Sequence, residues 1–184
     1  LPATIDHSQR AHSSVGGSSA KRIMECPGSM LLCEKYPSKS SEYAEAGTAG
    51  HEAIDMILQG KTKDDRDVIG LVFNKIVITE EFFDEAIAPA LQIFDDLQRE
   101  LGDIDFYNEQ RVTFPGIDGA FGTVDIVGTS RDRTVILDWK LGAGVPVMAQ
   151  ENAQLMYYAY AAAHTKPTDQ FPRQADRDVH RQPA

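Results

Sequence analysis

Apolar residues recur at helical spacing through the first half of the chain, and capping residues mark where helices begin and end. A short helix is expected over residues 18–26, a second around residues 30–32 and a longer one from residue 40 to Gly60. The charged run that follows, residues 61–67, is expected to be a solvated loop. The apolar stripe on the long helix consists of Tyr43, Ala46, Ala49, Ala53, Ile54, Ile57 and Leu58.

A further amphipathic helix is expected to start at Thr79, because the following Glu80 and Glu81 suit a helix N-terminus. Pro89 is expected to kink this helix or to split it, since proline lacks the amide hydrogen that the helix needs. The residues expected on its buried side are Phe82, Phe83, Ile87, Leu91, Phe94, Leu97 and Leu101.

After this helix the pattern changes to short, β-prone apolar runs bounded by turn residues. Strands are expected over residues 107–114, 120–128 and 134–139, with residues 129–133 as the turn between the last two. A helix rich in Ala, Leu, Met and Tyr is expected over residues 149–163. This order of elements predicts a mixed α+β protein of the α/β class.

The foldable part of the chain is expected to be one domain over residues 18–164, which is long enough to bury a sizeable core. Residues 1–17 are polar and rich in Gly and Ser, so a flexible N-terminal arm is expected there. Residues 165–184 show no helix or strand period, and an irregular or disordered tail is expected.

The composition, with 42% hydrophobic and 25% charged residues, is that of an ordinary soluble globular protein. No apolar run approaches the ~20 residues that cross a bilayer, and the start of the chain lacks the pattern of a signal peptide, so a cytoplasmic protein is expected. The net charge of −10 argues against a protein that coats DNA broadly, because such affinity comes mostly from lysine and arginine. An acidic metal site is compatible with that charge, since bound cations supply local positive charge.

Cys26 and Cys33 lie seven positions apart, a spacing that puts both on one face of a helix. Two thiols are too few for a structural zinc site or an iron–sulfur cluster without further ligands. The sequence favours two buried, apolar side chains here, and a disulfide is not expected in a reducing compartment.

Charged residues end or interrupt two neighbouring apolar runs of the predicted hairpin. Asp125 interrupts the first run, Asp138 directly follows the second, and Lys140 comes two positions later. The hairpin therefore brings two carboxylates and an amine close to one point. Carboxylate oxygens are preferred ligands of Mg²⁺ and Mn²⁺, and a lysine beside such an ion can orient or deprotonate a water for attack on a phosphodiester. The pattern predicts a metal-dependent nuclease.

Four short motifs then follow one another along the chain. They are Gly47-Thr48-Ala49-Gly50-His51, Gly122-Thr123-Val124-Asp125, Asp138-Trp139-Lys140 and Gln154-Leu155-Met156-Tyr157-Tyr158. In this order they resemble the PD-(D/E)XK nuclease superfamily, specifically its RecB-like exonuclease branch and, within it, a phage-type uncharacterised RecB-like domain. Residues 18–27 also resemble the N-terminal signature of that branch, a serine followed by Cys-Pro. The resemblance implies a restriction-endonuclease-like core, in which helices flank a central mixed sheet.

The resemblance implies a role for each matched position. Asp125 and Asp138 would be the carboxylate ligands of the metal, with the backbone carbonyl of Trp139 as a third ligand. His51 resembles the helix-borne histidine of the branch, which also ligates metal and favours Mn²⁺. Lys140 would position the attacking water and stabilise charge that develops on the phosphate.

Three further positions have supporting roles in this interpretation. Gln154 and Tyr158 lie four positions apart and share one helix face, so they would contact the region of the lysine or the DNA backbone. Glu109, on the strand before Asp125, matches an acidic position of the family and would support the ligands.

The chain departs from the resemblance at two points. Iron–sulfur members of the branch use one cysteine near the N-terminus and three near the C-terminus, whereas here only Cys26 fits, so no cluster is expected. The superfamily core is αβββαβ, but nothing apolar follows the helix that ends near Ala163. The final core strand is therefore missing from the pattern.

The sequence thus predicts a metal-dependent DNA nuclease using Mg²⁺ or Mn²⁺, and the resemblance implies an exonuclease with a role in phage or bacterial DNA recombination, replication or repair. Its partners would be DNA and a helicase or recombination protein, without a membrane. Two alternatives stay open: a non-catalytic DNA-end or protein-binding module on the same fold, and a phosphohydrolase acting on small nucleotides. Each residue also has a structural interpretation, with His51 as a core histidine, the aspartates as solvated turn residues and Lys140 as an ion-pair partner.

Overall fold

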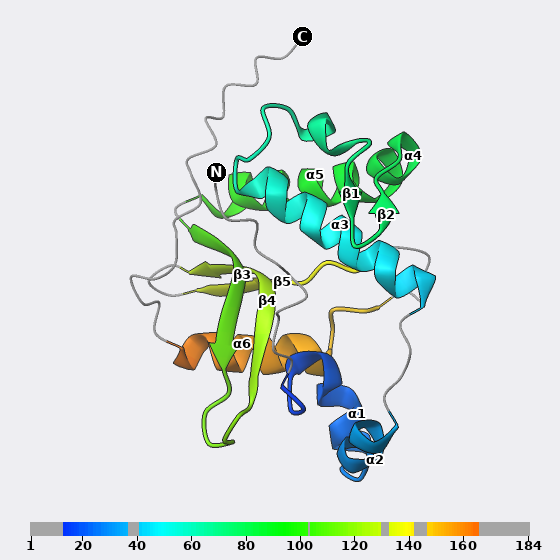
Figure 1. The fold of residues 1–184 in the computed structure, drawn as a ribbon. Coiled ribbons are helices and arrows are strands. Elements are labelled where there is room, and N and C mark those ends of the chain that lie inside the picture. The colour runs from blue at the N-terminus through cyan, green and yellow to red at the C-terminus, as the bar shows by residue number, and fades with distance from the viewer. Residues whose placement is uncertain (1–12, 37–40, 103, 130–132, 142–146, 166–184) are drawn as a thin grey trace.

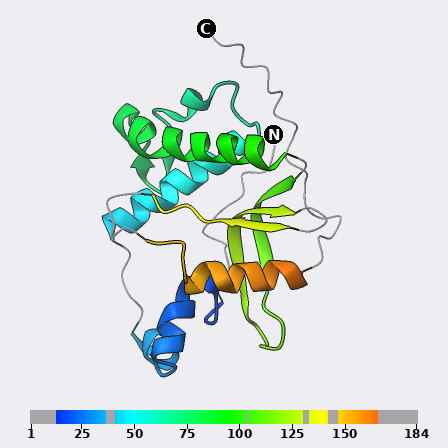
Figure 2. The same ribbon diagram turned by 180° about the vertical axis from the view of Figure 1, so that it is seen from behind.

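The computed structural model describes residues 13–36, 41–102, 104–129, 133–141 and 147–165, and they form a mixed α and β fold (Figure 1). Helices α3 and α5 lie on one side of a three-stranded antiparallel sheet, and α6 crosses the other side (Figure 2). The predicted α/β class is confirmed. Because the described strands are all antiparallel, the mixed sheet that the resemblance implies remains a prediction.

The described chain starts with a segment that packs against the sheet and α6, although the sequence assigns it to a flexible arm. Ser13 Oγ donates to the carbonyl oxygen of Gly119 at 2.6 Å, and the Tyr157 hydroxyl donates to that of Val15 at 2.9 Å. A Cβ on Gly17 would lie 2.4 Å from the ring of Tyr158. The glycine therefore allows the close approach, and Ser13, Val15 and Gly17 contact the rest of the fold; residues 1–12 of the predicted arm lie outside the described part.

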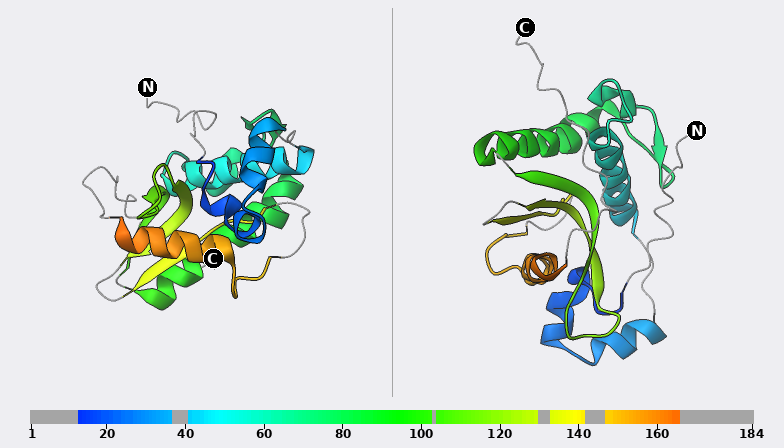
Figure 3. Two further views of the ribbon diagram at one scale, coloured as in Figure 1. Left: turned by 90° about the horizontal axis from the view of Figure 1, so that it is seen from below. Right: turned by 90° about the vertical axis from the view of Figure 1, so that its left-hand side faces the viewer.

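A helical hairpin follows and projects from the body of the molecule (Figure 3). It consists of a 3₁₀ turn η2 (Gly17–Ser19), α1 (Ala20–Glu25) and α2 (Ser29–Lys35), and α1 ends before Pro27 as expected. Cys26 and Cys33 are both free and exposed, so the prediction of two buried thiols is wrong. Cys26 is the C-cap of α1 and Cys33 lies on α2, so the two thiols do not share the face of one helix.

Helix α3 (Glu42–Leu58) is the longest helix described, and the Ser41 side chain caps it by accepting a hydrogen bond from the Ala44 amide. Most of the predicted stripe is buried, from Ala49 to Leu58. Tyr43 is an exception at 68% exposed, because it lies in the first turn, ahead of the part of α3 that meets the rest of the core.

The segment after α3 is more ordered than the solvated loop predicted from its charges. It contains the 3₁₀ turn η3 (Asp65–Val68) and a small hairpin of β1 (Val72–Phe73) and β2 (Ile76–Val77), which the sequence pattern did not reveal. Arg66 bonds to Glu80 at 2.7 Å and to Asp84 at 2.9 Å. These ion pairs join the segment to the next helix, a long-range contact that local charge density does not indicate.

The next helix is interrupted where the sequence predicts. It consists of α4 (Glu80–Phe82), a π-helical turn η4 (Phe83–Ile87) and α5 (Ala88–Leu101). Pro89 lies in the first turn of α5, where its missing amide hydrogen breaks the regular bonding of the turn before it. Ile87 and Phe94 are fully buried, which confirms the predicted inner face.

The sheet has the order β3 (Asp105–Thr113), β4 (Phe121–Thr129) and β5 (Thr134–Leu137). These bounds differ by one or two residues from the predicted strands. Helix α6 (Ala153–His164) begins four residues later than predicted, because the Asn152 side chain accepts from two amides there and caps it.

Two hydrophobic cores lie on opposite faces of this sheet. The α3–α5 core contains residues of α3, η4 and α5 together with Phe106, Ile126 and Trp139. The α6 core contains Tyr157, Tyr158 and Ala161 with valines of β3 and β4. No helix in the described part of the chain is long and apolar enough to cross a membrane.

Strand β3 changes the direction of its side chains in the middle. Asn108 bonds to Asp55 on α3, whereas Gln110, two positions later, lines a pocket with residues of α6. A regular strand would put both side chains on one face, because its period is two. The break coincides with Glu109, whose φ of 53° is in the left-handed region.

The side chains of strand β4 also change face, at the level of Glu109 in β3. Asp125 bonds to a residue of α3 and Ile126 belongs to the α3–α5 core, although neighbours in a regular strand point to opposite faces. Val124 and Val127, on either side, both belong to the α6 core. The pairs Asn108–Ile126 and Gln110–Val124 flank Glu109 and Asp125, which are not paired with each other in the ladder, so both strands change at one level of the strongly curved sheet (Figure 3).

Candidate functional site

The predicted site residues lie where α3, β4, the end of β5 and α6 meet. His51 is on α3, and its Nδ1 lies 3.2 Å from Oδ1 of Asp125, 74 positions away in the sequence. Asp125 is only 8% exposed because it sits in the middle of β4, between the two helical layers. The structure thus brings together the first two of the predicted metal ligands.

The second oxygen of Asp125 also has a partner. The backbone N–H of Trp139 donates to Oδ2 of Asp125 at 2.7 Å, which ties β4 to the chain just beyond β5. The Trp139 side chain is buried in the α3–α5 core and anchors that stretch of chain. The contact that the structure shows for Trp139 is therefore made by its amide, whereas the sequence predicts a role for its carbonyl.

Asp138 lies one residue past the end of β5 and carries the other predicted carboxylate. It forms an ion pair with Lys140, and Gln154 Nε2 donates to its Oδ1 at 2.8 Å. The Asp138 side chain is 7% exposed, whereas that of Lys140 is 47% exposed. Helix α6 therefore holds the carboxylate in place while the amine faces solvent.

The negative charges of the site act on one another. Burial raises the pKa of Asp138, the negative charge of Asp125 raises it further, and Lys140 and His51 oppose the rise. Burial lowers the pKa of His51, but the hydrogen bond and charge of Asp125, with the charges of Asp138 and Glu109, outweigh it, so the pKa is raised. The site is thus a buried region of negative potential that favours a cation.

Glu109 is part of this electrostatic group, because its charge acts on His51. The pairs on either side, Asn108–Ile126 and Gln110–Val124, put it at the level of Asp125. This position agrees with the supporting role predicted for Glu109, whereas its left-handed backbone has no signal in the sequence.

Tyr158 lies beneath the site rather than at its surface. A Cβ on Gly122 would lie 2.6 Å from its ring, so the glycine of the second motif makes room for the tyrosine of the fourth. Burial raises the pKa of Tyr158 to about 12, and a hydrogen bond with Gln154 opposes the rise. Tyr158 therefore supports Gln154 from below, and its predicted contact with the region of the lysine or the DNA backbone stays a prediction.

The residues fit a hard divalent cation by their chemistry. Two buried carboxylates close enough for Asp125 to raise the pKa of Asp138 repel each other, and a cation between them would remove that cost. Among the described residues, no group of three His, Cys, Asp or Glu side chains surrounds one point. Asp125 and Asp138 each accept a hydrogen bond from another protein group.

Asp55 is a buried acidic residue next to this site that the sequence pattern did not single out. It lies one turn after His51 on α3, is 5% exposed, and accepts hydrogen bonds from Asn108 and Gln59, both at 2.6 Å. The available signal was its spacing of four from His51, which puts both on one helix face.

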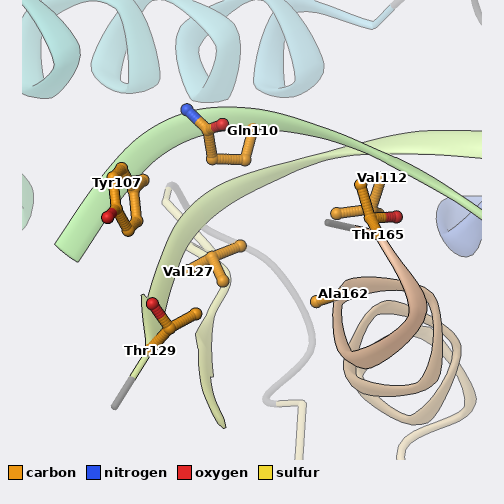
Figure 4. A pocket seen from close by; sticks show the side chains of 7 residues that line it. All are labelled: Tyr107, Gln110, Val112, Val127, Thr129, Ala162 and Thr165. Atoms are coloured by element: carbon orange, nitrogen blue, oxygen red, sulfur yellow. The ribbon is translucent and has the colours of Figure 1, made fainter. Parts of the chain in front are cut away.

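A small pocket lies on the opposite face of the sheet, between β3, β4 and the end of α6 (Figure 4). Its volume of about 30 Å³ is enough for a water molecule and far too small for a nucleotide. The lining residues are Tyr107, Gln110, Val112, Val127, Thr129, Ala162 and Thr165. None of the predicted site residues lines it, so it is not the candidate site.

A comparison with protein families finds one family model, described as "Protein of unknown function (DUF2800)", that matches residues 12–168. The matched stretch includes every residue of the candidate site. No solved structure matches the chain significantly.

Proposed function

The chain belongs to the DUF2800 family, whose description assigns no function, and from its site we propose that it is a metal-dependent deoxyribonuclease. One observation carries the proposal: two buried carboxylates, Asp125 and Asp138, meet beside a helix-borne histidine and a solvent-facing lysine. A buried pair of like charges is costly, and an acidic pair with a lysine is the set that phosphodiester hydrolysis needs.

Asp125, Asp138 and His51 would hold Mg²⁺ or Mn²⁺, with the Trp139 carbonyl as a further predicted ligand. When bound, the ion would polarise the scissile phosphate and make a water more acidic. The imidazole nitrogen of His51 in an otherwise oxygen set favours Mn²⁺ over Mg²⁺.

Lys140 would act on the reacting groups directly. Its amine is half exposed beside a buried carboxylate, so it can reach a phosphate that approaches from solvent. It would orient the attacking water and stabilise negative charge as it develops on the phosphate oxygens. The resemblance implies cleavage that leaves a 5′-phosphate and a 3′-hydroxyl.

Gln154 would position Asp138 rather than contact DNA. Its side-chain amide bonds to Oδ1 of Asp138, and α6 holds the glutamine through its own packing on the sheet. This contact keeps one oxygen of the carboxylate in a fixed direction, which a metal ligand requires.

We propose that the enzyme acts as an exonuclease on DNA in the cytoplasm of a bacterial or phage-infected cell, in recombination, replication or repair. With a net charge of −10, the chain would bind DNA weakly by itself. A helicase or recombination protein would therefore supply much of the affinity.

A non-catalytic DNA-end or protein-binding module is the second candidate. It is favoured by the pairing of Lys140 with Asp138 and by the absence, within the described residues, of three ligand side chains around one point. The intact set of two carboxylates and a lysine favours the nuclease, because a binding module has no use for it.

Cleavage of linear DNA labelled at the 5′ or 3′ end, with Mn²⁺, Mg²⁺ or EDTA, tests the proposal. Asp138→Ala and Lys140→Ala are each compared with a surface control of the same charge, Asp118→Ala and Lys61→Ala, both at exposed positions. We expect metal-dependent loss of label in the wild type and both controls, and none in the site variants. Unchanged cleavage by Asp138→Ala would refute the nuclease, and folded, Mn²⁺-loaded protein without cleavage would favour the binding module.

A further inference from the structure

Asp55 is a buried carboxylate that the proposed chemistry does not use. It accepts hydrogen bonds from two neutral amides, Asn108 Nδ2 and Gln59 Nε2, one to each carboxylate oxygen. Burying a charge next to neutral groups is costly, so such a residue needs a structural or functional reason. The bond to Asn108 joins α3 to β3 directly beside Glu109.

Both neighbours of Glu109 in β3 are held by side-chain hydrogen bonds. The Asn108 side chain donates to Asp55, and the Gln110 side chain donates to the Asn108 carbonyl at 2.7 Å. The first bond holds the side chain of Asn108 and the second holds its carbonyl oxygen, so the residue before Glu109 is fixed at both groups.

Glu109 has a φ of 53°, a conformation that a residue with a side chain rarely adopts inside a strand. Such a conformation persists only where the surrounding structure holds it. Its consequence is the change of face in β3: Asn108 bonds to α3, whereas Gln110 lines the pocket on the α6 side (Figure 4). Side chains at one level of neighbouring strands point to the same face, so Glu109 shares the α3 side with Asp125, which bonds to His51.

The change of face brings Glu109 to the site. In a regular strand the side chains alternate between the two faces of the sheet. If the Asn108 side chain faces α3, the next side chain would then face α6. Here Glu109 lies at the level of Asp125, between the pairs Asn108–Ile126 and Gln110–Val124, and its charge acts on the imidazole of His51 on α3.

We propose that Asp55 is a positioning residue, which through Asn108 holds the left-handed backbone at Glu109 and so makes Glu109 the third carboxylate facing the metal position. The inference rests on the proposed function, because it concerns the same divalent-ion site. In this inference Glu109 contributes directly to the affinity for the metal ion. Asp55 increases that affinity without contacting the ion.

Binding of Mn²⁺ alone, measured by the electron paramagnetic resonance of the free ion without DNA, tests the inference. We expect Asp55→Ala and Asn108→Ala each to weaken binding by about tenfold or more, as loss of a group that orients a ligand does. Gln59→Ala is the matched control, because it removes the other bond to Asp55 and leaves the bond between α3 and β3 intact. It should change binding by less than about twofold.

Asp55→Asn separates positioning from charge. The asparagine keeps an oxygen that can accept from Asn108 but carries no charge, so Mn²⁺ binding should stay within about threefold of the wild type. If Asp55 acted through its charge, Asp55→Asn would weaken binding as much as Asp55→Ala, and the inference would be wrong. The double variant Asp55→Ala with Glu109→Gln should bind no more weakly than Glu109→Gln alone, because both changes remove the same contribution.

If a variant at Asp55 does not fold, Glu109→Gly tests the inference instead. Glycine adopts a positive φ without strain, so the melting temperature should stay the same or rise while Mn²⁺ binding weakens by about tenfold or more. A lower melting temperature with unchanged Mn²⁺ binding would show a purely structural role and overturn the inference.

The proposed function is tested separately in the same assay by Asp125→Ala. If the wild type binds Mn²⁺, Asp125→Ala does not, and the variants at Asp55 and Glu109 bind like the wild type, then the proposed function stands and the inference fails. A wild type that binds no Mn²⁺ overturns both.

Discussion

The candidate site has two halves that are built differently. The helix half, consisting of His51, Glu109 and Asp125, joins α3 to the middle of the sheet; Asp125 is buried, and the His51 side chain is 21% exposed. The lysine half, consisting of Asp138, Lys140 and Gln154, lies at the end of β5 and opens to solvent through its lysine.

The halves also differ in how their carboxylates are held. Asp125 accepts from a backbone amide within the core, a contact that is part of the fold itself. Asp138 is held by two side chains, one from α6 and one that is half exposed. Substitutions in the helix half should therefore cost both stability and chemistry, and those in the lysine half should cost mainly chemistry.

Replacement of Asp125 should have the largest effect. Asp125→Ala should lower DNA cleavage by about a thousandfold or more, because a metal ligand is lost. It should also destabilise the protein by about 1–3 kcal/mol, since the Trp139 amide loses its buried acceptor. Asp125→Asn keeps an acceptor and should recover much of the stability but not the activity. Urea denaturation measures the loss of stability, and cleavage assays measure the loss of activity. Equal losses of stability for Asp125→Ala and Asp125→Asn would contradict the role of the acceptor.

Lys140→Ala should come next, with a loss of cleavage of about a hundredfold or more and little change in stability. An ion pair with a half-exposed lysine contributes little to folding, because solvent screens it. The measurement is kcat with saturating Mn²⁺, beside the midpoint of urea denaturation. A large loss of stability would break the contrast between the halves.

Asp138→Asn should have opposite effects with and without metal. Burial and the charge of Asp125 raise the pKa of Asp138, so its charged form is disfavoured in the folded protein. The neutral asparagine should therefore raise the melting temperature in EDTA. Mn²⁺ should raise the melting temperature of the wild type but not that of Asp138→Asn, because the variant lacks this carboxylate ligand of the metal. Calorimetry in EDTA and in Mn²⁺ checks both signs.

His51→Ala should have a smaller and more selective effect, a loss of the preference for Mn²⁺ over Mg²⁺ by about tenfold. The imidazole is the nitrogen donor of the helix half, and the remaining oxygen donors suit Mg²⁺ equally well. Cleavage rates across a titration of each ion measure the ratio. An unchanged ratio would mean that His51 is a core histidine.

Tyr158→Phe should have the smallest effect on cleavage, because the ring lies beneath the site. Its effect should appear in alkaline stability. The pKa of Tyr158 is raised from 10.0 to about 12 by burial, so its contribution is fully present below pH 10 and is lost as the pH rises towards 12. Between these values the wild type should lose about 2–3 kcal/mol more stability than Tyr158→Phe. Parallel losses would contradict the burial of this hydroxyl.

Much of the fold could be predicted from the sequence where the pattern is local. The inner face of α5, the break at Pro89 and the three strands follow from periodicity and from proline chemistry. The hairpin of β1 and β2 was missed because two-residue strands are too short for a period. The exposure of Cys26 and Cys33 was missed because a spacing of seven implies a shared face only within one continuous helix, and α1 ends at Glu25.

The sequence allowed the residue types of the candidate site to be predicted, but not how these residues are arranged in space. Asp125 and Asp138 were recognisable because a charge within an apolar run needs a reason. The role of Asp55 was not recognisable, since an acidic residue on a helix is ordinary until its partner on β3 is known.

By itself, the sequence determined the helices, the strands and the set of groups capable of chemistry, because these depend on neighbours within a few positions. Tertiary structure decided the contact of His51 with Asp125 across 74 positions, the partners of Asp55 and the left-handed backbone at Glu109. The physical reason is that burial, long-range hydrogen bonds and strained dihedral angles are stable only when distant segments pack together, and no local propensity encodes them.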